Sequence, residues 1–190
     1  MAIQLYADGQ SEEALSNSVK AVMQKSLSDA PAPRLVFANP EEGQAWLAEM
    51  SQRLQKRIPD KSDREDFLIS VQYEATRAGL DPQLVLSLIQ VESAFNKYAV
   101  SRVGARGYMQ VMPFWAKTIG RPDHNLFDLR LNLRYGCTIL RHYLDIEHGN
   151  LFRALGRYNG SLGKSKFPNL VISNHRKYMN YSNNYKFIGQ

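Results

Sequence analysis

The chain of 190 residues is long enough to bury the core of one domain, with or without an appendage. Its apolar content of 44%, with 11% aromatic residues, is typical of a globular protein and excludes wholesale disorder. The single cysteine, Cys137, excludes an intrachain disulfide and a cysteine-rich metal site. We expect it to pack in a helix as a small apolar side chain.

Charge is distributed unevenly along the chain. Residues 1–66 hold 8 Lys/Arg and 11 Asp/Glu, a net charge of −3, whereas residues 67–190 hold 16 and 7, a net charge of +9. This asymmetry predicts two units, of which the second binds an anionic partner: nucleic acid, acidic lipid or a carboxylate-bearing cell-wall glycan.

No apolar run is long enough to span a membrane, so we expect no stable membrane insertion. No signal peptide is visible in the sequence.

The pattern along the chain predicts helices nearly throughout. A second helix begins with Asn39 as its cap and Pro40 at its first position. At the start of the third, Ser62 and Glu65 have the spacing of a capping box, and Gly79 ends that helix. The other expected helices, apart from the one described next, cover residues 11–28, 113–120, 128–149 (the longest), a segment ending in 157–161, and 169–181.

The helix that follows Gly79 is the most apolar, and it carries a glutamate. Asp81 is its expected N-cap and Pro82 its first residue. A helical wheel places Glu92 on the same face as Val85 and Leu88, so we expect the carboxyl group to lose hydration and its pKa to rise. Such a group can serve as a general acid near neutral pH. The alternative is a glutamate at the helix end that reaches solvent or pairs with an arginine.

Two short segments downstream of Glu92 add candidate site residues. "GYMQVMP" offers the amide of Gln110 for an N-acetyl group, and Met109 or Met112 for a sugar face, although the spacing alone favours core filling for both methionines. "RYNGS" places Tyr158 at a helix end, where a buried hydroxyl needs a partner such as a glutamate. Taken alone, such a tyrosine is more often structural.

Residues 91–113, "VESAFNKYAVSRVGARGYMQVMP", resemble the signature of the soluble lytic transglycosylases, in the lysozyme-like superfamily. "LNLRYG" (131–136) is similar to their Asn-Ile-x-x-Gly segment, and "RYNGS" (157–161) to their Tyr-Asn-Ala-Gly element. The resemblance covers roughly residues 66–180 and implies an all-α, lysozyme-like domain, with room for one small hairpin in 104–111. Two departures stand out: Tyr108 replaces a leucine of the signature, and 160–161 reads Gly-Ser instead of Ala-Gly.

By this resemblance Glu92 is the sole catalytic carboxyl group of a peptidoglycan lytic transglycosylase. It would protonate the glycosidic oxygen between N-acetylmuramic acid and N-acetylglucosamine, and then take the proton of the muramic C6 hydroxyl as that oxygen attacks C1. The product is a 1,6-anhydromuramoyl end, made without water. The expected substrate-binding residues are Ser101, Tyr108, Met109, Gln110, Met112, Tyr158 and Asn159.

The count of acidic residues fits a mechanism with one carboxyl group. A hydrolysing glycosidase normally needs two, and downstream of Glu92 the acids are Asp123, Asp128, Asp145 and Glu147. None is an obvious partner, although a lysozyme-type hydrolase remains open if Asp123 faces Glu92. An inactive cell-wall-binding scaffold is a second alternative. The sequence contains no recognisable nucleic-acid-binding motif, so we do not expect a nucleic-acid binder. The histidines are dispersed along the chain and predict no metal site.

The expected organisation is a helical extension over residues 1–60 and a lysozyme-like domain over residues 61–190. We expect peptidoglycan glycan strands as the substrate, no cofactor and no nucleic-acid partner. The extension offers a surface for a cell-envelope protein partner. A location in the periplasm or cell envelope follows from the substrate alone.

Overall fold

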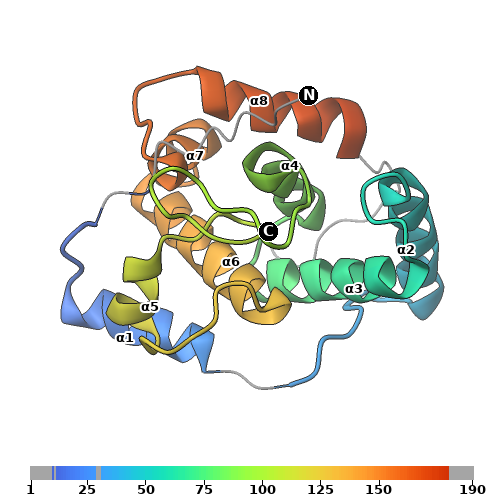
Figure 1. Ribbon diagram of the computed structural model, residues 1–190, viewed down its shortest axis with the longest axis horizontal. Helices are drawn as coiled ribbons and strands as arrows, with labels where there is room; N and C mark the ends of the chain where they lie inside the picture. Colours follow the sequence, from blue (N-terminus) through green and yellow to red (C-terminus); the bar gives the residue numbers. More distant parts are fainter. Residues whose placement is uncertain (1–9, 11, 29–30, 180–190) are drawn as a thin grey trace.

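The computed structural model describes residue 10, residues 12–28 and residues 31–179, and the predicted all-α fold is confirmed for these residues (Figure 1). The described ranges contain no strand. The elements in chain order are α1 (Asn17–Leu27), α2 (Pro40–Leu54), α3 (Lys61–Arg77), α4 (Pro82–Ser93), α5 (Pro113–Ile119), α6 (Leu129–Ile146), α7 (Leu151–Asn159), α8 (Lys166–Asn174) and a π-helical turn, η1 (His175–Met179).

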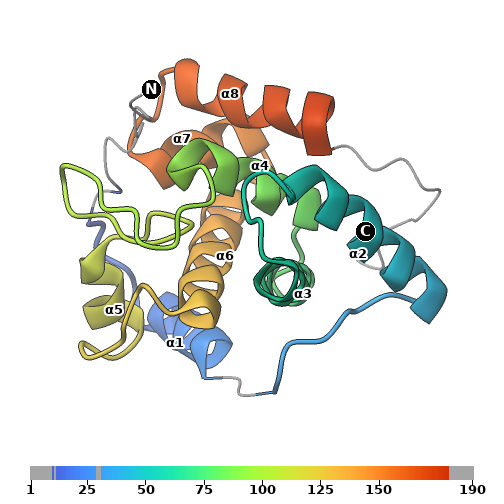
Figure 2. The same ribbon diagram turned by 45° about the vertical axis from the view of Figure 1, so that its right-hand side comes forward.

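Helix α4 runs through the middle of the molecule. It packs between α8 on one side and α3 on the other, while α6 contacts both α3 and α7 (Figures 1 and 2). This central position explains why nearly every residue of α4 is buried. A polar side chain near the end of α4 is therefore held inside the domain.

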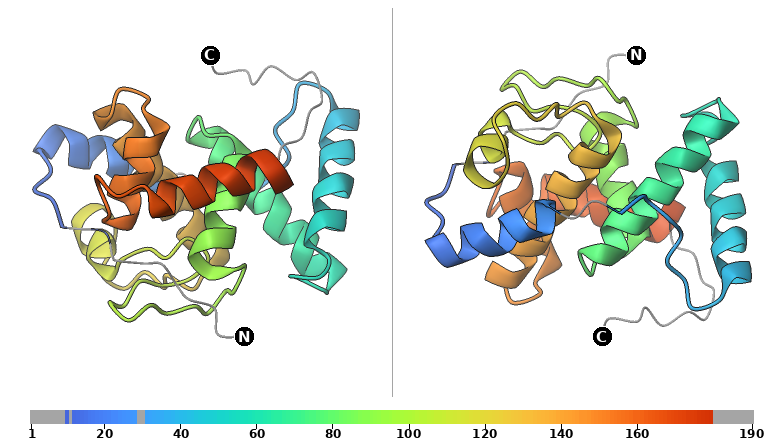
Figure 3. Two further views of the ribbon diagram at one scale, coloured as in Figure 1. Left: turned by 90° about the horizontal axis from the view of Figure 1, so that it is seen from above. Right: turned by 90° about the horizontal axis from the view of Figure 1, so that it is seen from below.

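The N-terminal helices cover two different sides of this arrangement. Helix α1 packs on α6 and α5, whereas α2 packs on α3, as the two views of Figure 3 show. Their buried side chains, including Met23 of α1 and Trp46 of α2, belong to the same hydrophobic cluster as the central helices. The Nε1 group of Trp46 donates a hydrogen bond to Gln83 Oε1 (3.3 Å), so α2 shields the polar side of α4 from solvent.

Some predicted helix boundaries are confirmed and others are wrong. Asp81 caps α4 by accepting a hydrogen bond from the Gln83 N–H (2.8 Å), as expected. Helix α3, however, is capped by Asp60 and not by the predicted Ser62. We attribute the difference to Arg64. Its Nη1 group donates hydrogen bonds to the carbonyl oxygens of residues 58–60 and so holds this loop against the first turn of a helix that begins directly after Asp60.

The first predicted helix is shorter in the structure, and the last begins three residues earlier than predicted. Helix α1 begins at Asn17, after Ser16 accepts a hydrogen bond from the Val19 N–H (3.3 Å), so residues 12–16 are not helical. Helix α8 begins at Lys166 and ends at Asn174, where η1 continues the chain. Residues 11 and 181, the predicted outer ends of these helices, lie outside the described residues.

The small hairpin allowed for residues 104–111 is reduced to isolated pairings. Val100 pairs with Arg106, and Arg106 with Val111, each as a single antiparallel bridge. Within the described part of the chain, no helix is both long and apolar enough to cross a membrane.

Candidate active site

Glu92 lies in the last turn of α4, directly before an unusual stretch of backbone. Ala94 and Phe95 both adopt left-handed conformations, with φ of 49° and 66°. A bulky residue such as phenylalanine pays a free-energy cost of order 1 kcal/mol in this region, and such strain is concentrated at functional sites. The strained turn ends α4 abruptly and directs the chain into the loop that precedes α5.

The carboxyl group of Glu92 is buried and unpaired. Glu92 is 2% exposed, and its Oε2 atom has no hydrogen-bond partner among the described residues. Burial raises the pKa of this carboxyl group well above its ordinary value, because desolvation penalises the charged form. The alternative of a solvated or arginine-paired glutamate therefore does not match the structure. Burial therefore favours the protonated form of Glu92 more than it does for an exposed glutamate.

Tyr158 reaches the same place from α7. The residue is fully buried, and its pKa is raised first by desolvation and then by the charge of Glu92, which places the two groups close together. The hydroxyl donates a hydrogen bond to the carbonyl oxygen of Met109 (2.8 Å). The partner of this hydroxyl is therefore the Met109 carbonyl and not the glutamate that the sequence suggested.

The turn over residues 107–112 is held by side chains and by its own backbone. Gln110 has φ of 49°, and its Nε2 group donates hydrogen bonds to the carbonyl oxygens of Gly107 (2.9 Å) and Ala99 (3.2 Å). The Gln110 Oε1 atom is buried without a partner among the described residues. Its amide group thus braces the turn with the nitrogen and leaves the oxygen available for a donor.

The remaining predicted site residues lie around this turn with different surroundings. Met109 is buried and Met112 is half-buried. Ser101 accepts a hydrogen bond from the Ala105 N–H (3.0 Å), which shapes the preceding loop. Tyr108 packs its ring on Phe67, with ring centroids 4.8 Å apart, and so contributes to the core. Asn159, next to Tyr158, is buried.

Asn132 of α6 is a positioning residue that was not among the predicted site residues, although it lies in the segment similar to Asn-Ile-x-x-Gly. Its Oδ1 accepts a hydrogen bond from the Met109 N–H (2.8 Å), and its Nδ2 donates to the carbonyl oxygens of Arg106 (2.9 Å) and Leu126 (2.8 Å). One turn later on the same face, a Cβ atom on Gly136 would lie 2.3 Å from the Met109 Sδ atom. The available signal was this segment itself, with an asparagine four residues before a glycine.

We expect Asn132→Asp to damage the site nearly as much as Asn132→Ala. The carboxylate of aspartate keeps the acceptor for Met109 but faces two carbonyl oxygens with no proton to donate, and each unmade buried hydrogen bond costs about 1–3 kcal/mol. Both variants should lower the free energy of unfolding by about 2–4 kcal/mol in urea titrations. Asn125→Ala, at an exposed turn residue of the same type, is the control and should change it by less than about 1 kcal/mol. Equal stability of Asn132→Asp and the wild type would contradict this role.

The four acids downstream of Glu92 all have other surroundings. Asp123 is exposed, and its carboxylate forms an ion pair with Arg121 (2.8 Å), which lowers its pKa. Asp128 caps α6. Asp145 pairs with Arg141 on the same helix, and Glu147 pairs with Arg153 and Arg157. None shares the buried, unpaired state of Glu92.

The histidines do not form a metal site. No group of three or more His, Cys, Asp or Glu side chains in the described ranges could hold a metal ion. His124 instead contacts the Tyr135 hydroxyl (2.8 Å), and His175 contacts Asp81 (2.7 Å).

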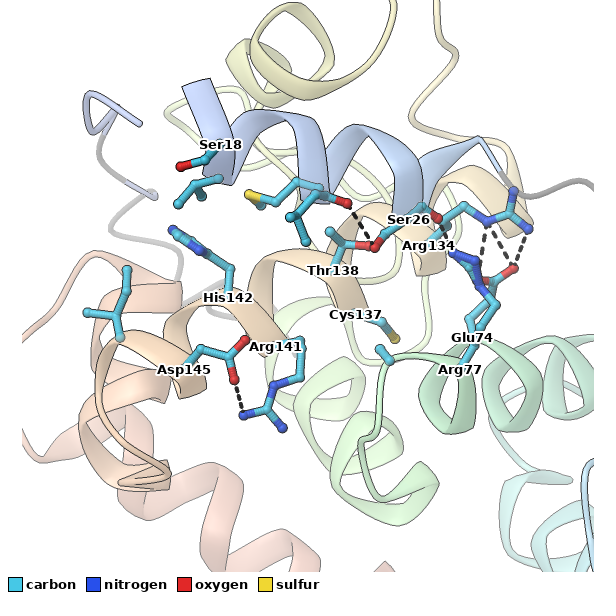
Figure 4. A pocket seen from close by; sticks show the side chains of 15 residues that line it. Ser18, Ser26, Glu74, Arg77, Arg134, Cys137, Thr138, Arg141, His142 and Asp145 are labelled. Atoms are coloured by element: carbon cyan, nitrogen blue, oxygen red, sulfur yellow. Dashed lines mark hydrogen bonds and ion pairs between the residues drawn. The ribbon is translucent and has the colours of Figure 1, made fainter. Parts of the chain in front are cut away.

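A cavity of about 550 Å³ lies away from Glu92, between α1 and α6 (Figure 4). Val19 and Met23 of α1 line one side of it, and Arg141 and His142 of α6 line the other. Glu92 and Tyr158 do not line this cavity. It therefore marks loose packing beneath α1 and is separate from the candidate active site.

Residues 69–178 match the family described as Transglycosylase SLT domain. The "Transglycosylase" of Enterobacteria phage PRD1 is 39% identical over 102 residues, which cover 50% of this chain and 37% of that protein. The "Membrane-bound lytic murein transglycosylase C" of Yersinia pestis is 33% identical over 124 residues, covering 56% of this chain and 35% of that protein. The chain thus spans little more than a third of the length of these relatives.

Among solved structures, an inactive mutant of the lytic transglycosylase Slt from Pseudomonas aeruginosa matches at 18% sequence identity. The match covers 86% of this chain and 41% of that one, with a TM-score of 0.45.

Proposed function

Because the chain belongs to the Transglycosylase SLT domain family, we propose that it cleaves peptidoglycan as a lytic transglycosylase, with Glu92 as its only catalytic carboxyl group. The observation that carries this proposal is the burial of an unpaired Glu92 beside Tyr158. The names of the phage and Yersinia relatives support the same class of reaction.

The proposed reaction uses Glu92 twice. As a neutral acid, Glu92 gives its proton to the glycosidic oxygen between N-acetylmuramic acid and N-acetylglucosamine, and the bond from that oxygen to C1 breaks. As a carboxylate, it then removes the proton of the muramic C6 hydroxyl while that oxygen bonds to C1. Glu92 ends protonated, no water is consumed, and the muramoyl residue keeps a 1,6-anhydro ring.

The positions of the other acids favour this reaction over hydrolysis. Two carboxyl groups about 5–9.5 Å apart serve most glycoside hydrolases. The sequence left Asp123 open as the second group, but it is exposed and paired with Arg121. The substrate's own C6 hydroxyl supplies the nucleophile in a mechanism that needs one carboxyl group.

The same proposal assigns roles to the residues around Glu92. The free Oε1 atom of Gln110 accepts a hydrogen bond from an N-acetyl N–H group. Met112 borders the sugar, and Tyr158 fixes the Met109 carbonyl beside the acid. Four residues complete the proposed binding set without such a direct argument: Ser101, Tyr108, Met109 and Asn159.

We further propose that residues 61–190 form the catalytic domain and residues 1–60 an extension that packs against it. The net charge of +9 over residues 67–190 favours an anionic wall polymer. A periplasmic or cell-envelope location follows from that substrate, and a cell-envelope protein is the proposed partner of the extension.

The rate of cleavage should depend on pH through Glu92. The first step needs the protonated carboxyl group, and burial raises its pKa, so kcat/KM should be highest on the acidic side and fall as the pH rises through the raised pKa of Glu92. The measurement is the release of soluble muropeptides from purified peptidoglycan between pH 5 and pH 9, with circular dichroism at each pH as the control for folding. A rate that rises with pH through neutrality would contradict an acid role, and no release at any pH would contradict the activity.

A further inference from the structure

The segment that precedes α1 reaches the candidate active site. Residues 12–16 rise from the start of α1 toward α7 (Figure 1). Gln10, at the far end of this segment, is only 6% exposed although it belongs to no helix. Its burial therefore comes from contacts with the domain.

Gln10 lies against two residues of the candidate active site. The Met112 N–H donates a hydrogen bond to the Gln10 Oε1 atom (3.3 Å), across 102 positions of sequence. The Gln10 amide also lies beside the Tyr158 hydroxyl, where it acts to lower the pKa that burial raises. The Gln10 Nε2 atom has no well-aligned hydrogen-bond partner among the described residues. The side chain thus occupies space between Met112 and the tyrosine next to Glu92.

Further contacts hold the segment near the site. Glu13 forms an ion pair with Arg157 (3.3 Å), the residue before Tyr158, and both side chains are partly exposed. Leu15 packs against the hydrophobic core. The segment is therefore attached by a few contacts along its length, at Gln10, Glu13 and Leu15.

The chemistry of Gln10 resembles that of the proposed substrate. Its carboxamide carries the same C=O and N–H groups as an acetamido substituent on a sugar, and it already uses the Met112 N–H as a donor. A glycan cannot bind that N–H while Gln10 does. We propose that Gln10 and residues 12–16 form an autoinhibitory strap, in which Gln10 competes with an N-acetylated sugar of the substrate. This inference rests on the proposed function.

The strap should inhibit reversibly and only in part. One neutral hydrogen bond and one partly exposed ion pair each shift an equilibrium by about threefold to tenfold at most. The apparent affinity for glycan is reduced by the fraction of molecules with the strap open.

The test is Gln10→Ala in the full chain. Truncating the amide removes the competitor, so KM for soluble peptidoglycan glycan strands should fall by about threefold to tenfold while kcat stays unchanged. The Kd for an N-acetylglucosamine trimer, measured by calorimetry, should fall by a similar factor. Gln24→Ala, at an exposed glutamine of α1, is the matched control and should change neither quantity.

The outcomes separate the strap from the proposed function. Unchanged or raised KM and Kd in Gln10→Ala would overturn the strap, and a cleaving wild type would leave the proposed function standing. If neither protein cleaves but the trimer binds more tightly to Gln10→Ala, the strap stands and the proposed function fails. If neither protein cleaves and the trimer binds both equally, both proposals are overturned.

Discussion

Replacing Glu92 with glutamine is expected to lower the rate of glycan cleavage by about 10²–10⁴-fold, because a positioned general acid contributes a factor of that size. Glutamine keeps the shape of the side chain but has no proton to give to a leaving oxygen. The rate is measured as muropeptide release from purified peptidoglycan. Glu49→Gln, at a surface glutamate paired with Arg53, is the control and should retain full activity.

Glu92→Gln should also stabilise the fold above acidic pH, which separates loss of chemistry from loss of structure. In the unfolded chain Glu92 ionises near its ordinary pKa of 4.5, whereas burial raises the pKa in the folded protein. Between the two values only the folded state binds the proton, so wild-type stability falls by about 1.4 kcal/mol per pH unit, and above the folded value it falls no further. The variant lacks this contribution.

Thermal unfolding of the wild type and Glu92→Gln at several pH values measures this difference. Equal melting temperatures at pH 4 that diverge in favour of the variant toward pH 7 are the expected result. A variant that is less stable at pH 7 would contradict the burial of an unpaired carboxyl group. Its inactivity would then have a structural explanation.

The second large effect is expected at the ion pair between Arg134 of α6 and Glu74 of α3. Both side chains are buried, and the Arg134 Nη2 group lies 2.8 Å from the Glu74 Oε1 atom. Removing one member of such a pair leaves a buried charge and costs about 3–5 kcal/mol. Arg134→Met should lower the free energy of unfolding by about 3 kcal/mol, because Arg77 (3.5 Å) still contacts Glu74.

Urea titration provides the measurement, and the chain offers two informative comparisons. Arg141→Met, in the same helix, breaks an exposed pair with Asp145 and should cost less than about 1 kcal/mol. The double variant Glu74→Leu/Arg134→Met removes both charges of the pair and should be more stable than Arg134→Met alone, because apolar replacement of a buried pair is nearly neutral and Arg77, which loses its contact with Glu74, is partly exposed. A double variant as unstable as Arg134→Met alone would show that packing, and not the unpaired charge, causes the loss.

Local rules explain why the position of Glu92 could be predicted from the sequence. Asp81 and Pro82 fix the start of α4, and from there the helical period determines which face Glu92 shares with Val85 and Leu88. Those neighbours are buried in the structure, and Glu92 with them. The prediction needed no knowledge of the rest of the chain beyond a core to bury that face.

Features that depend on distant contacts could not be predicted in this way. The start of α3 shifts to Asp60 because Arg64 binds carbonyl groups of the preceding loop. The Tyr158 hydroxyl was expected to have a partner, but the Met109 carbonyl is 49 positions away in the sequence. Gln10 contacts Met112 across more than half of the chain. No periodicity or capping rule indicates such contacts.

The most direct test of the account is the chemical identity of the new glycan ends. Purified peptidoglycan is digested with the wild-type chain, and the released muropeptides are analysed by mass spectrometry. The account predicts 1,6-anhydromuramoyl ends, one water lighter than reducing ends and absent from a Glu92→Gln digest. Reducing ends in the wild-type digest would instead mean that water is the nucleophile, and would contradict a mechanism in which Glu92 acts as the only carboxyl group.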